Sequence, residues 1–148
     1  MIAHELGHAW LFQWAKSHAS ALEEINDAMR ADLPRFQAWL DNHARGWRSW
    51  FTEKQWGIGI AHALYGSPWT GLTMPLQKRV MMYTDMMAAR TGGRQGAGHE
   101  PAYWRSQRTS APHEAIAHTT AAYVTGDTLF AQLFPTITAW WRSRVGLP

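Results

Sequence analysis

The chain begins with two histidines four residues apart and a glutamate directly after the first, in the run His4-Glu5-Leu6-Gly7-His8. Apolar residues on both sides recur near a 3.6-residue period and predict a helix from residue 2 to about residue 17. Residues four apart lie on one face of a helix, so both imidazoles can point at one ion. The sequence therefore predicts a metal-binding helix at its start.

Glu5 lies about 100° round this helix from His4, by the 3.6-residue period. Its carboxylate can therefore reach a water on the metal rather than the metal itself. Zinc lowers the pKa of such a water to about 7, and a carboxylate can accept its proton. We therefore expect His4 and His8 to bind Zn²⁺ and Glu5 to be the general base that activates water for attack on a peptide carbonyl. The alternative is an ordinary amphipathic helix with two surface histidines.

The composition limits the ligands and excludes several classes of partner. The 148 residues include no cysteine, so disulfides and thiolate ligands are excluded and a metal has to use His, Asp or Glu. The net charge of +3 is spread along the chain, without the basic stripe typical of nucleic-acid binding. No stretch approaches the roughly 20 apolar residues of a membrane span. We expect one globular domain over residues 1–148, with no nucleic-acid partner and no membrane span, and the oligomeric state stays open.

Hydrophobic periodicity and helix-breaking residues predict a mostly α fold. Ser20 and Glu23 have the spacing of a capping box, Pro34 can start a helix, and Pro135 can bend or restart one. Clusters of glycine and proline predict loops. The pattern indicates no β-strand. The expected helices cover residues 2–17, 21–30, from 34 onward, 76–90, 112–124 and 129–144, and the expected loops cover 57–75 and 91–98.

A catalytic zinc site needs a third protein ligand and an open position for water. The metzincin pattern is excluded, because Leu11 and Trp14 stand where it has glycine and histidine. Glu23 and Asp27 have the Glu-x-x-x-Asp spacing of the thermolysin-like pattern. Glu23, however, would lie about 22 Å from His8 along a straight helix, so only a sharp turn would bring it to the metal. The simpler interpretation is that Glu23 caps a helix.

The run from Ala3 to Ala9 closely resembles the active-site helix of the zincin metallopeptidases. The run Pro112-His113-Glu114-Ala115-Ile116-Ala117-His118 is similar to the second helix of the anthrax-lethal-factor-like group of zincins. A Phe-Pro step often follows in that group, and here it occurs at 134–135. The resemblance implies that Glu114 is the third zinc ligand. It also implies a zinc-dependent endopeptidase that acts on a peptide or protein substrate.

Several alternatives to this assignment stay open in the sequence. Glu114 can instead be an acid favoured by the helix dipole in the first turn. His118, four residues later on the same face, is an alternative ligand, a partner of a ligand or a transition-state donor. His113 also competes for the metal. Tyr103 is the nearest tyrosine before Glu114 that can stabilise an oxyanion, but its spacing does not match the group.

Two features depart from the resembling group. Its members normally carry a β-sheet upstream of the active-site helix, whereas here the first ligand is residue 4. The separation of His8 and Glu114 is also longer than in compact members. We therefore expect a helical zincin-like domain whose usual upstream sheet is missing and is supplied elsewhere. The second hypothesis is a non-catalytic helical structural or interaction domain that retains a zincin-like helix and binds through its Trp- and Arg-rich middle.

Overall fold

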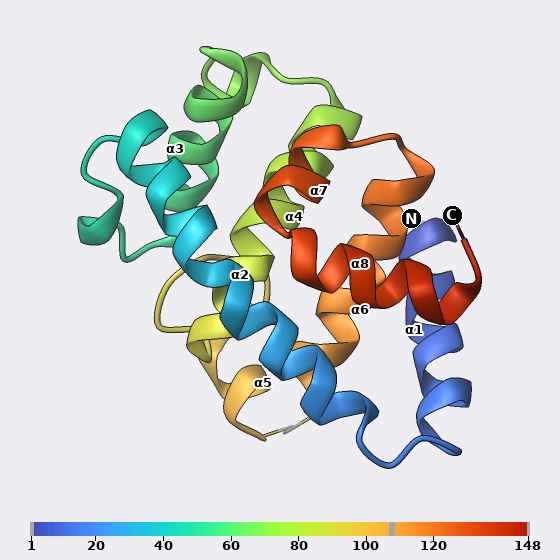
Figure 1. Cartoon of the computed structure of the whole chain (residues 1–148). Coiled ribbons are helices and arrows are strands. Elements are labelled where there is room, and N and C mark those ends of the chain that lie inside the picture. The colour runs from blue at the N-terminus through green and yellow to red at the C-terminus, as the bar shows by residue number, and fades with distance from the viewer. Residues whose placement is uncertain (1, 107–108, 148) are drawn as a thin grey trace. The chain divides into compact units, whose positions relative to one another are not determined.

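The computed structural model describes residues 2–106 and 109–147, and within these ranges the regular elements are all helical (Figure 1). This confirms the mostly α prediction. None of the described helices has both the length and the apolar character needed to cross a membrane. The elements are α1 (Ile2–Ala15), α2 (Ala21–His43), η1 (Trp47–Ser49), α3 (Glu53–Tyr65), η2 (Trp69–Gly71), α4 (Met74–Thr91), α5 (Pro101–Ser106), α6 (Ser110–Val124), α7 (Thr128–Leu133) and α8 (Pro135–Val145), where η denotes a 3₁₀ helix.

The chain forms two compact units. Unit 1 comprises Met1–Phe36 and Thr109–Pro148, and unit 2 comprises Gln37–Arg108. The two segments that carry the expected metal ligands and base therefore fall in unit 1. A single metallopeptidase domain over residues 1–148 stays a prediction.

In unit 1, α1 packs directly against α6, and the two helices lie side by side in Figure 1. Gly7, which is buried, permits the close approach. A Cβ atom at this position would lie 2.6 Å from the Cα atom of Ala117 and 3.0 Å from the carbonyl oxygen of Ile116. Both are backbone atoms, so rotation of a side chain cannot relieve the overlap. The close packing of α1 against α6 therefore requires glycine at position 7.

A buried carboxylate ties α2 to α8 within unit 1. Asp32 is 2% exposed and accepts hydrogen bonds from the backbone N–H groups of Thr136 (3.0 Å) and Ile137 (2.9 Å). The N–H groups of a first helical turn lack partners within the helix and carry partial positive charge. Asp32 therefore accepts hydrogen bonds from N–H groups that would otherwise lack a partner at the start of α8. The large apolar side chains buried in unit 1 are Leu11, Ile25, Met29, Phe36, Ile116, Phe130, Leu133, Phe134, Ile137 and Trp141.

The predicted helix boundary at Pro34 was wrong, because α2 runs through this proline without a break. Pro34 is exposed, while Asp32 and Phe36 on either side are buried. Contacts of these flanking residues hold the helix on both sides of the missing N–H group. The expected break at residues 17–20 is confirmed, and so is the restart at Pro135 between α7 and α8.

The predicted loop over residues 57–75 was wrong in its first half, because α3 extends to Tyr65. Thr52 and Gln55 form a capping box that starts this helix. Gly59 lies inside the helix and makes room for the indole of Trp50, whose ring a Cβ atom would overlap. The glycine therefore serves packing rather than a turn. The other predicted loop, 91–98, is confirmed between α4 and α5.

The substitution Gly7→Ala is expected to lower the free energy of unfolding by about 1–3 kcal/mol, because its methyl group would overlap the backbone of α6. Gly57→Ala is the matched control, since a Cβ atom there would meet the ring of Trp69 at an ordinary 3.5 Å. The better helix propensity of alanine should leave that variant neutral or about 1 kcal/mol more stable. Urea unfolding followed by circular dichroism measures both. A Gly7→Ala variant as stable as Gly57→Ala would contradict the close packing.

The substitution Asp32→Ala is expected to cost about 2–4 kcal/mol, because two buried N–H groups of α8 lose a charged acceptor. Asp27→Ala on the same helix is the control. Asp27 is exposed and pairs only at the surface, with Arg30, so its loss should cost less than about 0.5 kcal/mol. Thermal unfolding of both variants provides the comparison. Similar losses of stability in the two variants would show that the hydrogen bonds of Asp32 contribute no more than a surface ion pair does.

Candidate metal centre

Four side chains of unit 1 converge from two helices. α1 supplies His4 and His8, and α6 supplies Glu114 and His118. The members of each pair are four residues apart, so each helix presents both side chains on one face. Gly7, which admits the backbone of α6, directly precedes His8. The close approach of the two helices therefore brings the two pairs together.

The carboxylate of Glu114 lies next to both histidines of α1. Its Oε2 atom is 3.5 Å from Nε2 of His4 and 3.7 Å from Nε2 of His8. The two Nε2 atoms are themselves 3.1 Å apart. Ligand atoms on a tetrahedral zinc with bonds of about 2.0–2.2 Å lie about 3.3–3.6 Å from one another. The separation of 3.5 Å falls in this range, and those of 3.1 Å and 3.7 Å lie within about 0.2 Å of it.

His118 lies on the same side of the carboxylate. Its Nε2 atom is 3.9 Å from Oε2 of Glu114, and its ring centroid is 4.7 Å from that of His4. His4, Glu114 and His118 each offer one ligand atom, and these three atoms all lie within 4.8 Å of one another. The sequence left the role of His118 open. Its only signal there was the four-residue spacing from Glu114.

Burial keeps His4 in its neutral form near pH 7. Desolvation is the main cause that lowers the pKa of His4 from 6.5 to about 4. The neighbouring imidazole of His118 lowers it further, the carboxylate of Glu114 raises it, and His8 lowers it again. A neutral imidazole keeps the lone pair that a metal needs. His4 therefore has the protonation state of a ligand at neutral pH.

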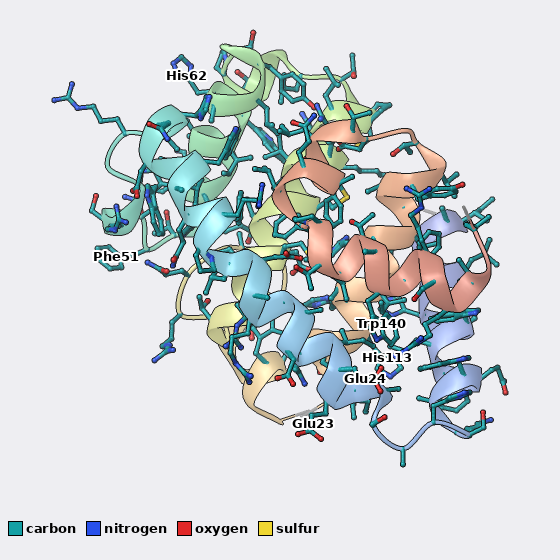
Figure 2. The ribbon with its side chains drawn as sticks, in the orientation of Figure 1. Glu23, Glu24, Phe51, His62, His113 and Trp140 are labelled. Carbon is teal, nitrogen blue, oxygen red and sulfur yellow. The ribbon has the colours of Figure 1, made fainter. Side chains whose placement is uncertain are left out.

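His113, labelled in Figure 2, contacts a histidine of α1 rather than taking a place among the four. Its ring stacks on that of His8, with centroids 6.2 Å apart and an interplanar angle of 23°. The side chain is half-buried, and this burial is the main cause that lowers its pKa. The imidazole of His8 lowers the pKa further, while Glu114 raises it.

Glu5, the expected base, is exposed on α1 directly after His4. Water and a substrate can reach a carboxylate in this position. Its role as general base stays a prediction.

Glu23, the alternative third ligand, is exposed at the start of α2 and points away from the ribbon (Figure 2). It belongs to none of the groups of His, Asp and Glu in the described residues that are close enough to hold an ion. Ser20, the expected capping partner of Glu23, donates instead to Glu24 at 2.6 Å. Glu24 also accepts hydrogen bonds from Trp140 and Arg144 of α8. This segment therefore serves the packing of unit 1.

Tyr103, the candidate for oxyanion stabilisation, belongs to unit 2. Its ring stacks on that of His99, with centroids 4.0 Å apart. This contact gives the tyrosine a local packing role, and its part in catalysis stays a prediction.

Comparisons with known proteins give no family for this chain. A scan against protein-family models, a search of curated proteins and a search of solved structures each found no match. The resemblance to zincins therefore depends on two short motifs, and a functional assignment depends on the geometry of the four side chains.

Proposed function

We propose that the chain is a zinc-dependent metallopeptidase with a glutamate-type zincin site. In this proposal His4, His8 and Glu114 bind zinc and Glu5 is the general base. The observation that carries the proposal is the position of the Glu114 carboxylate, 3.5 Å and 3.7 Å from the two Nε2 atoms of α1. The motif on α1 alone predicted the two histidines, and this carboxylate completes a set of three ligands.

The chemistry of the donor set supports zinc. Two imidazoles and one carboxylate, with a fourth position left for water, form a donor set found in catalytic zinc sites of peptidases. The side chain of Glu114 is only 5% exposed. Transfer of a carboxylate from water into a protein interior costs free energy that a nearby cation offsets. A divalent cation among these side chains would therefore be stabilised by Glu114 and would stabilise it in return.

The proposed reaction is the hydrolysis of a peptide bond by water. Zinc held by His4, His8 and Glu114 would supply Lewis acidity, which lowers the pKa of a bound water to about 7. Glu5 accepts the proton of the attacking water and returns it to the leaving amine. The exposure of Glu5 and its position next to His4 support this role. His4 and His8 would hold the ion, and Glu114 would balance part of its charge.

Purified protein is expected to bind one zinc ion per chain. The variants His4→Ala and Glu114→Ala should lose the ion, because each removes one of three ligands, whereas Glu5→Gln should keep it. Glu23→Ala is the matched control, since it removes an exposed glutamate outside the site. Elemental analysis after dialysis, together with calorimetric titration of zinc, measures binding. Wild-type protein without affinity for zinc would refute the proposal and favour a non-catalytic helical domain.

Cleavage of peptides is expected to fall by about 10²–10⁴-fold in Glu5→Gln, because the attacking water loses its general base. Mass spectrometry of a mixed peptide library gives the rate of cleavage. The variant should retain its zinc, which separates loss of the base from loss of the metal. A chelator should abolish cleavage by the wild type, and added zinc should restore it. Wild-type rates in Glu5→Gln would show that another group is the base.

A further inference from the structure

We propose that His118 is a fourth protein ligand of this metal centre, which then consists of three imidazoles and one carboxylate. This inference rests on the proposed function, because it concerns the same ion. It changes the coordination number, since the open position for water becomes a fifth site instead of a fourth.

The first argument comes from the distances between donor atoms. Two atoms bound to one ion at about 2.1 Å cannot lie more than about 4.2 Å apart. Nε2 of His118 lies 3.9 Å from Oε2 of Glu114, which is within this limit. The same oxygen is 3.5 Å and 3.7 Å from the two Nε2 atoms of α1. Each imidazole taken singly therefore lies within the distance at which it can share an ion with this oxygen.

The second argument is that the contact between His118 and this oxygen has the wrong length for a hydrogen bond. Hydrogen bonds from nitrogen to oxygen span about 2.7–3.2 Å, and 3.9 Å is well beyond that range. A histidine that positioned Glu114 by donating to Oε2 would lie closer. The separation instead suits two ligands at a wide angle on one ion. The distance is therefore compatible with coordination of one ion by His118 and Oε2 of Glu114.

The third argument comes from burial. The side chain of His118 is 12% exposed and that of Glu114 is 5% exposed, while His4 and His8 are 24% and 27% exposed. The donors of α6 therefore lie deeper than those of α1. Coordination by His118 from the buried side leaves the solvent side for water, and Glu5 is also exposed. A fourth ligand in this position does not close the site.

The ring contacts of His118 differ from those of His113, the other histidine of α6. The ring of His118 lies 4.7 Å from that of His4 and is tilted by 50°, whereas His113 stacks nearly parallel on His8. His118 forms a group with His4 and Glu114 in which the ligand atoms lie within 4.8 Å of one another. Catalytic zinc sometimes expands to five ligands, and imidazole also suits iron, copper and nickel. The fourth ligand therefore widens the range of ions that the site can hold.

Nuclear magnetic resonance of ¹⁵N-histidine-labelled protein loaded with ¹¹³Cd²⁺ tests this inference. An imidazole nitrogen bound directly to ¹¹³Cd is split by scalar coupling, and a nitrogen that only lies nearby is not. We expect three split imidazole resonances in the wild type. His118→Ala should retain two of them, and the control His113→Ala should retain all three.

Two outcomes would overturn the inference in different ways. Two split resonances in the wild type, both of which persist in His118→Ala, would leave the proposed three-ligand site intact and exclude His118. Absence of bound cadmium in the wild type would overturn both the fourth ligand and the metal site of the proposed function. If His118→Ala does not fold, the wild-type count together with the His113→Ala spectrum still decides between three imidazoles and two.

Discussion

The contact between the backbones of α1 and α6 at Gly7 determines the geometry of the candidate metal centre. A methyl group at this position would meet the Cα atom of Ala117 at 2.6 Å, so the helices can approach this closely only with glycine. His8 follows Gly7 in α1, and His118 follows Ala117 in α6. Metal–ligand distances tolerate deviations of only about 0.2 Å. A small outward shift of either helix would therefore separate donor atoms that a single ion has to join.

Unit 1 stabilises its buried carboxylates in two different ways. Asp32 accepts two backbone N–H groups from the first turn of α8, which satisfies the acid within the protein. Glu114 lies next to imidazoles, one of which, His4, is held neutral by burial. Imidazole nitrogens next to a carboxylate offer several donor atoms in the same place. This combination is what a divalent cation requires, and it distinguishes Glu114 from an acid that serves only the fold.

Local sequence patterns correctly predicted those features that depend on a single helix. The four-residue spacing within each pair of α1 and α6 is visible in the sequence, and so is the restart at Pro135. Pro34 and Gly59 misled the prediction, because packing decides both. Buried neighbours carry α2 through the proline, and the ring of Trp50 occupies the space beside the glycine. The position of His118 next to His4 could not be predicted from the sequence either, since it depends on how α1 and α6 pack.

Anomalous diffraction at the zinc absorption edge, from crystals of the zinc-loaded protein, tests the central claim most directly. The account predicts one strong peak in unit 1, about 2.0–2.2 Å from Nε2 of His4, Nε2 of His8 and a carboxylate oxygen of Glu114. A peak whose ligands exclude Glu114, or the absence of any peak between α1 and α6, would contradict it.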